Sequence, residues 1–108
     1  MKELEDSTFE QETATGIQVL DFWAPWCGPC VTAGPMFESI ANSFSEEELK
    51  TLSFGKVNVD KNPETKQKFN VKSIPTFIVL KDGLEVGRFK GAQGLTTNIL
   101  NLIEKAKT

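Results

Sequence analysis

Both cysteines of this 108-residue chain lie in one stretch, Trp26-Cys27-Gly28-Pro29-Cys30. The stretch follows the apolar run 19–23 and precedes a segment with helical spacing. If a helix begins near Cys27, its unpaired backbone N–H groups and the positive end of its dipole favour a thiolate at that sulfur. The thiolate is the nucleophilic form of cysteine, and Cys30, one turn further on, can attack a mixed disulfide formed at Cys27. The spacing therefore predicts thiol–disulfide exchange, in which Cys27 attacks and Cys30 resolves.

The two residues between the cysteines suit the same chemistry. Gly28 has no side chain and leaves room for an incoming substrate. Pro29 fixes φ in the first helical turn, where its missing N–H costs little.

Three other interpretations of the cysteine pair stand beside this one. A structural disulfide would be a weak one, because closing so small a ring removes little entropy from the unfolded chain. A zinc site would need two more ligands, and the chain has no histidine and no other cysteine. Inert buried thiols would not need the Gly-Pro insert at a helix start. The redox interpretation is favoured over these three.

Length and charge bound the class of protein. We expect residues 1–108 to form one domain with a core of its own. Twelve basic and fifteen acidic residues give a net charge of −3, which argues against non-specific nucleic-acid binding and against a polybasic membrane anchor. The expected partners are therefore other proteins.

The first six residues are charged and lack the apolar segment of a secretory signal. No run of the chain approaches the length of a membrane span. These features predict a cytoplasmic protein that does not bind membranes. In the cytoplasm a lone cysteine pair is more often catalytic than structural.

Hydrophobic patterning predicts alternating strands and helices. Segments rich in branched and aromatic residues predict strands at 17–23, 52–60, 77–80 and 85–89. Helical spacing or start signals predict helices at 7–15, 31–44, 63–70 and 95–107, the first from a capping box at Ser7-Thr8-Phe9-Glu10. The second helix should kink at Pro35 and continue, and Asp82-Gly83 should form a hairpin turn. The pattern predicts an α/β sandwich, a mixed sheet with helices on both faces.

Several further residues match one family in the right order along nearly the whole chain. They are Asp21 to Cys30, Pro35, Lys56, Val59-Asp60, Asn62-Pro63, Ser73-Ile74-Pro75-Thr76 and Gly91. Together they closely resemble the thioredoxin family. The resemblance implies a thioredoxin-like three-layer sandwich with a central mixed sheet.

The resemblance also implies an activity. Cys27 would be the exposed nucleophile and Cys30 the resolving thiol of a protein-disulfide reductase. The protein would be left oxidised across this pair and returned to the dithiol by a flavin-containing, NADPH-dependent thioredoxin reductase. The chain itself would bind no cofactor and no metal. A small domain with a shallow site is expected to be a monomer.

Two charged residues gain a role only through the resemblance. From spacing alone, Asp21 is more simply an aspartate at a strand edge facing solvent, and Lys56 a surface lysine. The family places the aspartate beneath the second cysteine and the lysine near it. A buried carboxylate holds its proton to higher pH. We therefore expect Asp21 to accept the proton of Cys30, with Lys56 modulating its charge.

The resemblance further implies a docking surface for partner proteins. An X–Pro bond is usually trans, so the base rate favours trans for Ile74–Pro75, whereas the family implies cis with Pro75 against the disulfide. The backbone of Ile74 would then pair with an extended substrate segment. Each surface residue alone is more simply structural, but together they form a shallow apolar rim: Trp26, Gly28, Pro29, Ile74, Pro75, Gly91 and Ala92.

The chain departs from the family pattern at three places. Val31 follows the second cysteine where many thioredoxins carry a basic residue, which predicts a slightly less acidic Cys27 or a different choice of partner. The amino-terminal segment is short, which puts the edge strand in doubt, and residues 45–50 resemble a small insertion.

Two other functions compete with a reductase. An oxidant or isomerase would use the same cysteines, but the Gly-Pro dipeptide resembles the reducing members, and equilibrium with glutathione would separate the two. A binding module would use the fold only to hold a partner and would tolerate loss of both cysteines.

Overall fold

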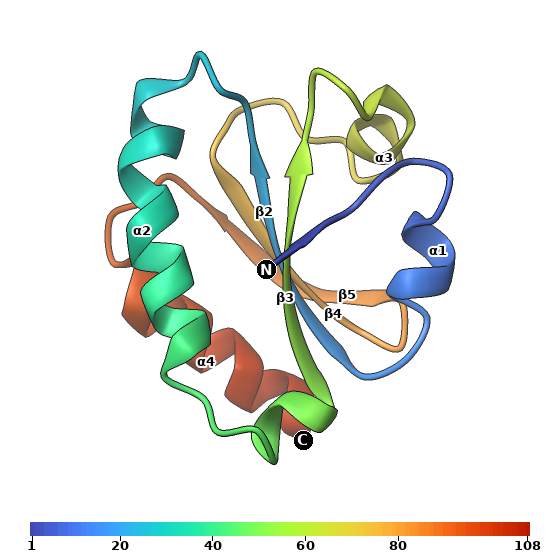
Figure 1. Cartoon of the computed structure of the whole chain (residues 1–108), viewed down its shortest axis with the longest axis vertical. Helices are drawn as coiled ribbons and strands as arrows, with labels where there is room; N and C mark the ends of the chain where they lie inside the picture. The colour runs from blue at the N-terminus through green and yellow to red at the C-terminus, as the bar shows by residue number, and fades with distance from the viewer.

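A five-stranded mixed sheet forms the middle layer of the structure, a computed structural model that describes residues 1–108 (Figure 1). Its strands are β1 (Lys2–Glu3), β2 (Ile17–Trp23), β3 (Leu52–Asn58), β4 (Thr76–Lys81) and β5 (Leu84–Lys90). The helices are α1 (Phe9–Glu12), α2 (Gly28–Asn42), α3 (Pro63–Lys68) and α4 (Leu95–Lys107), with a short 3₁₀ helix η1 at Glu48–Lys50.

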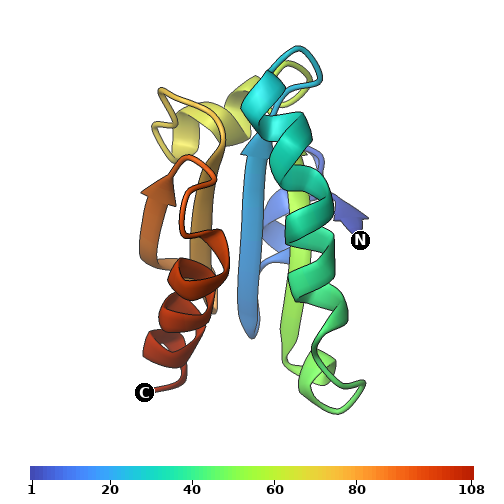
Figure 2. The ribbon, with the colours of Figure 1, turned by 90° about the vertical axis from the view of Figure 1, so that its left-hand side faces the viewer.

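The strand order is β1-β3-β2-β4-β5, with β2 in the centre. β2 runs parallel to β3 and antiparallel to β4, and β5 returns antiparallel to β4. Its central place follows from its sequence, because the side chains of Val19, Leu20 and Phe22 are fully buried and cover both faces. The ends of β2, β3 and β5 and the start of β4 therefore meet at one end of the sheet (Figure 2).

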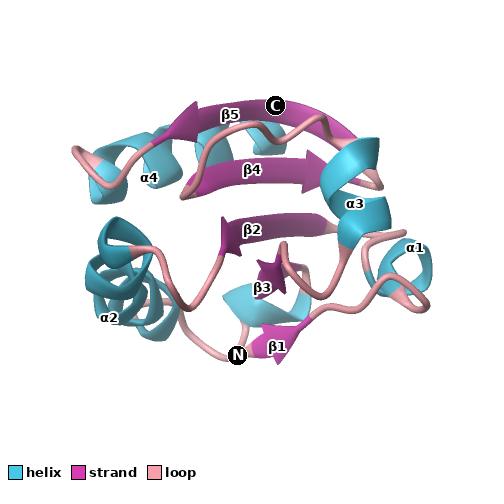
Figure 3. Cartoon of the chain, turned by 90° about the horizontal axis from the view of Figure 1, so that it is seen from above, coloured by secondary structure: helices cyan, strands magenta, loops and turns pink.

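Helices cover both faces of the sheet, as the predicted sandwich requires (Figure 3). On one face, α2 and α4 bury an apolar cluster built around Phe37, Phe77 and Ile99. On the other face, α1 and α3 cover a second cluster that includes both cysteines. The redox pair thus sits at the edge of a packed core.

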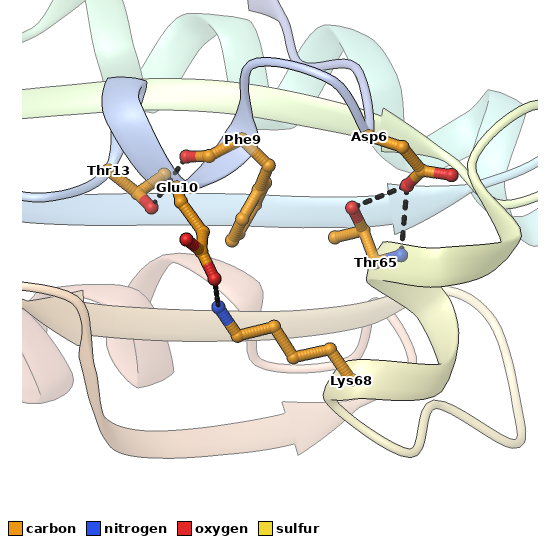
Figure 4. Close-up of polar contacts among 6 residues, drawn as sticks. All are labelled: Asp6, Phe9, Glu10, Thr13, Thr65 and Lys68. Carbon is orange, nitrogen blue, oxygen red and sulfur yellow. Dashed lines mark hydrogen bonds and ion pairs between the residues drawn. The ribbon is translucent and has the colours of Figure 1, made fainter.

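A polar connection joins the amino-terminal segment to α3 (Figure 4). The Asp6 carboxylate accepts hydrogen bonds from the hydroxyl of Thr65 at 2.6 Å, the backbone N–H of Thr65 at 2.8 Å and the backbone N–H of Glu64 at 3.1 Å. The two backbone N–H groups belong to the first turn of α3 and have no partner within the helix. Asp6 therefore caps α3 from another part of the chain. Burial alone would raise the pKa of Asp6, but the hydrogen bonds outweigh it and the pKa lies below its ordinary value.

The predicted capping box at Ser7 is wrong. α1 begins at Phe9, and its N-cap residue Thr8 makes no capping hydrogen bond through its side chain. Ser7 and Thr8 lie in a turn before the helix. They stay outside it because the neighbouring Asp6 is hydrogen-bonded to Thr65 of α3. The Thr8 hydroxyl instead donates to Glu12 at 3.2 Å.

The other predicted elements are confirmed within a few residues. α2 starts at Gly28, earlier than the predicted Val31, and continues past Pro35. Asp82 and Gly83 form the hairpin turn with φ of 49° and 84°, values that suit an Asp-Gly pair. The doubtful edge strand exists as the two-residue β1. None of the helices has the length and apolar character needed to cross a membrane.

Candidate active site

The disulfide between Cys27 and Cys30 lies at the start of α2. Cys27 is the N-cap residue, with extended backbone angles, and its sulfur accepts the backbone N–H of Cys30 at 3.2 Å. Pro29 occupies the first turn, where no helical N–H is needed. The N-terminal end of the helix therefore points its free donors at the Cys27 sulfur, the arrangement predicted from the spacing.

The two cysteines differ in their cover. Both are buried, Cys27 with 6% of its surface exposed and Cys30 with 2%. The expectation of an exposed Cys27 is therefore wrong in this oxidised form, in which Cys27 is only the less covered of the two. Gly28 and Pro29 are exposed beside them, and a side chain at Gly28 would meet no atom of this chain within 4 Å. An incoming disulfide would thus reach Cys27 before Cys30.

Trp26 projects from the surface next to Cys27, with 71% of its area exposed. Its indole N–H donates to the Asp60 carboxylate at 2.8 Å, which ties the ring to the loop after β3. Asp60 is one of the residues that carry the family resemblance, which implied no role for it. The one feature of the sequence that could have pointed to Asp60 is its position just after a predicted strand, at the end of the sheet where the cysteines lie.

The loop before β4 supplies the opposite wall. The Ile74–Pro75 bond is cis, as the resemblance implied and against the base rate. The carbonyl oxygen of Ile74 lies 3.8 Å from the Cys27 sulfur, and that of Pro75 accepts the N–H of Gly91 at 2.9 Å. Gly91 has φ of 80°, which favours glycine. Three loops thus converge on Cys27, and they carry the predicted rim residues: Trp26, Gly28, Pro29, Ile74, Pro75, Gly91 and Ala92.

Asp21 lies in the middle of β2 and is completely buried. The strand-edge position facing solvent, which spacing alone favoured, is therefore wrong. Neither carboxylate oxygen has a hydrogen-bond partner. Burial raises the pKa of Asp21 to about 7, even though the positive charge of Lys56 pulls it down. The group can therefore exchange a proton near neutral pH.

Lys56 is the register partner of Asp21 on β3. Its ammonium nitrogen lies 4.2 Å from the centroid of the Trp23 ring, and the two charged groups form no salt bridge. Lys56 is half-buried, so solvent screens its charge only in part, and that charge lowers the pKa of Asp21. Lys56 is thus not the free surface lysine that its strand pattern suggested.

A pocket of about 230 Å³ lies beside Lys56 and Cys30. Its walls include Trp23, Cys30, Glu38 and Lys56. The buried indole N–H of Trp23 has no hydrogen-bond partner in the chain. Sequence reasoning assigned no role to Trp23 or Glu38, and no local pattern marked them. A larger pocket, about 650 Å³, lies away from the cysteines, between Met1, α2 and the start of β3.

The arrangement supports dithiol–disulfide exchange. One sulfur lies at a helix N-terminus, and a second lies one turn away under cover. A fully buried carboxyl group with a pKa of about 7 lies in β2, the strand that leads into the cysteine loop. No group of three or more His, Cys, Asp or Glu side chains is placed to hold a metal ion.

Comparison with known proteins identifies close relatives. The thioredoxin family model matches residues 1–105. The chain is 49% identical to a thioredoxin of Listeria monocytogenes over 83 residues, 77% of each chain. It is 41% identical to a thioredoxin of Staphylococcus saprophyticus over 100 residues, 93% of this chain and 91% of the relative.

Solved structures agree with the sequence relatives. Fasciola hepatica thioredoxin superposes with a TM-score of 0.79 at 35% identity, covering 98% of this chain and 99% of that one. Plasmodium falciparum thioredoxin gives a TM-score of 0.82 at 32% identity, covering 97% and 98%.

Proposed function

The chain belongs to the thioredoxin family, and on that premise we propose that this thiol–disulfide oxidoreductase works as a reductase of disulfides in other proteins. The observation that carries the proposal is the Cys27 sulfur, which accepts the N–H of Cys30 and lies beside an apolar rim whose exposed members are Trp26, Gly28 and Pro29. A helix N-terminus stabilises the thiolate needed for attack, and the rim offers a surface on which a protein segment can lie.

The reaction proceeds in two exchanges. The Cys27 thiolate attacks one sulfur of the substrate disulfide, which forms a mixed disulfide and releases the other substrate sulfur as a thiolate. Cys30 then loses its proton and attacks the Cys27 sulfur, which releases the second substrate thiolate. The two released thiolates take up protons, and the two electrons they gain come from the dithiol, which ends as the Cys27–Cys30 disulfide.

Asp21 accepts the proton of Cys30 in the second exchange, directly or through a water. This role is supported by its complete burial in β2 and by a pKa of about 7, which suits a general base at neutral pH. Lys56 tunes that pKa through its charge, since it faces Asp21 across β2 and β3 without pairing with it. The pocket lined by Cys30 and Lys56 would admit a water beside Cys30 for this transfer.

The substrate docks on the apolar rim defined above. The backbone of Ile74 pairs with an extended segment beside the target disulfide, as an added strand would. The support for this role is that its carbonyl lies 3.8 Å from the Cys27 sulfur, at the point where a substrate sulfur must arrive. Main-chain pairing of this kind places few demands on substrate sequence.

An NADPH-dependent thioredoxin reductase returns the oxidised protein to the dithiol. The protein acts in this cycle as a monomeric electron carrier of the cytoplasm and contributes to cell redox homeostasis. Support for these assignments comes from family membership and from the small size of the domain with its shallow site.

The test is reduction of insulin disulfides with NADPH and a thioredoxin reductase, run beside the Cys27→Ser variant. We expect turnover by the wild type and none by the variant. Activity with dithiothreitol but not with the reductase would preserve the disulfide chemistry and reject the electron donor. Inactivity of the wild type with both donors would reject the reductase and favour a binding module.

A further inference from the structure

We propose that three exposed lysines around the rim, Lys61, Lys72 and Lys90, select protein disulfides flanked by acidic residues. We call them the lysine ring. The inference rests on the proposed reductase function and adds a substrate class to it, because backbone docking alone does not distinguish one flanking sequence from another.

Each lysine of the ring lies close in the chain to a residue that contacts the site. Lys61 follows Asp60, which binds the Trp26 indole. Lys72 stands two residues before Ile74, whose carbonyl lies beside the Cys27 sulfur. Lys90 precedes Gly91, whose N–H binds Pro75, and Lys90 is itself the register partner of Thr76.

The fold brings these three loops together from distant parts of the sequence. Lys61 follows β3, Lys72 precedes β4, and Lys90 is the last residue of β5. All three therefore lie at the end of the sheet where α2 begins (Figure 2). On the α2 side the residue after Cys30 is the uncharged Val31, and the pocket beside Cys30 is lined by one lysine, Lys56, and one carboxylate, Glu38. The exposed lysines of the ring thus add positive charge on the three loops at this end of the sheet.

The lysine ring is not neutralised within the chain. All three side chains are exposed, and none takes part in a salt bridge, whereas Lys50, Lys68, Arg88 and Lys107 do. The adjacent carboxylate, Asp60, already accepts the indole N–H of Trp26. Asp6, another carboxylate at this end, is turned toward α3 and binds Thr65.

The rest of the molecule has the opposite charge. The whole chain carries a net charge of −3, and an acidic run at 46–48 lies beside η1, at the far end of the sheet where β3 begins (Figure 1). Outside the ring nine basic and fifteen acidic residues remain, so an acidic segment is repelled by the net charge of the rest of the chain and attracted to the ring. Such a field orients the encounter and raises its rate, and salt screens it.

The occupant we infer is an extended protein segment with Asp or Glu within a few residues of the target disulfide. Its main chain pairs with Ile74, and its carboxylates lie among the lysine ring. The selection acts on the rate of encounter and leaves the exchange chemistry at Cys27 unchanged.

The test uses three peptides of equal length, each with one internal disulfide and with acidic, neutral or basic flanking residues. The pre-reduced full chain is mixed with each peptide, and the second-order rate constant is measured at about 20 mM and about 0.5 M salt. We expect the acidic peptide to react roughly tenfold faster than the basic one at low salt, and the two rates to converge at high salt.

Two triple variants locate the effect. K61Q/K72Q/K90Q should abolish the preference, and K61E/K72E/K90E should reverse it, an outcome that misfolding cannot produce. The control K81Q/K105Q/K107Q removes the same number of positive charges at the far end, one of them the Lys107 partner of Glu104, and should keep the preference.

Equal rates for all three peptides in the wild type at low salt would overturn the lysine ring and leave the reductase standing. Equal loss of preference in the ring and control Gln variants would also overturn it, because net charge alone would then suffice. Failure to reduce any peptide, the neutral one included, would overturn the proposed function itself.

Discussion

Asp21 and Lys56 face each other on adjacent parallel strands, yet they do not form an ion pair. The Lys56 ammonium lies 4.2 Å from the centre of the Trp23 ring, and both Asp21 oxygens are buried without a hydrogen-bond partner. A buried, unpaired carboxyl group is most stable in its protonated form. This relationship makes the protein's stability depend on pH in a definite direction.

The first prediction concerns the stability of the oxidised protein. Because burial raises the pKa of Asp21 from 3.8 to about 7, the folded state favours the protonated group. Its stability contribution is complete below the unfolded value and is lost as the pH rises through the folded one. We expect Asp21→Asn to match the wild type near pH 4 and to exceed its free energy of unfolding by about 4 kcal/mol above pH 7.

Urea unfolding of both proteins across this pH range checks that expectation. A stability difference that stays constant with pH would contradict it. Asp82→Asn is the matched control, since Asp82 lies in the exposed turn at the far end of the sheet.

The second prediction concerns the rate of substrate reduction. Asp21→Asn removes the proposed proton acceptor for Cys30, so we expect roughly 10- to 100-fold slower reduction near pH 7. The pH–rate profile of the wild type should bend near the pKa of Asp21, and that of the variant should lose the bend. An unchanged profile would reject the role, and Asp82→Asn should keep both the rate and the bend.

The third prediction separates Lys56 from Asp21. Lys56 lowers the pKa of the buried carboxyl group, so Lys56→Met should raise that pKa above the wild-type value of about 7. Titration of the carboxyl carbon of Asp21 by ¹³C NMR in the oxidised protein measures the shift directly. Lys81→Met, at the exposed far end of β4, should leave the titration where it is. A pKa that does not rise in Lys56→Met would remove the lysine from the proposed proton path.

The fourth prediction concerns the connection between the amino-terminal segment and α3. The hydrogen bonds from Thr65 and Glu64 hold the pKa of Asp6 below its ordinary value of 3.8. The resulting stability is present above that value and is lost as the pH falls through the folded pKa. Asp6→Ala should cost about 1 kcal/mol at pH 7, as loss of a helix cap does, and less in acid.

Glu10→Gln is the control for this connection, because it breaks only an exposed ion pair with Lys68 at 3.4 Å (Figure 4). We expect it to change the free energy of unfolding by a few tenths of a kcal/mol at most, roughly the value of an exposed pair. Equal costs for the two variants would show that Asp6 does not cap α3.

The fifth prediction compares two glycines of the rim. Gly91 has φ of 80°, where a side chain is strained, so Gly91→Ala should destabilise the protein by about 1–2 kcal/mol. Gly28 lies in the first turn of α2 with open space around it, so Gly28→Ala should stay within about 1 kcal/mol of the wild type. Denaturant unfolding of the two variants measures both, and equal destabilisation would contradict the argument.

The sequence by itself determined what local patterns can encode. Apolar spacing predicts the strands and helices, and an Asp-Gly pair predicts the hairpin. Two cysteines at the start of a helix predict thiol–disulfide exchange. These signals are local because the geometry of a turn or a helix start is set by neighbouring residues. The resemblance added the burial of Asp21 and the cis bond at Pro75, neither of which spacing or base rates favoured.

Only the tertiary structure decided how distant residues meet. The contact between Asp6 and Thr65 overrode the local capping signal at Ser7, because hydrogen bonds to a neighbouring helix held the chain outside α1. The position of Lys56 over Trp23, and not on Asp21, depends on how two strands pair. The lysine ring comes from three loops that sequence separates and the sheet brings to one end, because strand order and direction, unlike the local pattern, are fixed by packing of the whole chain.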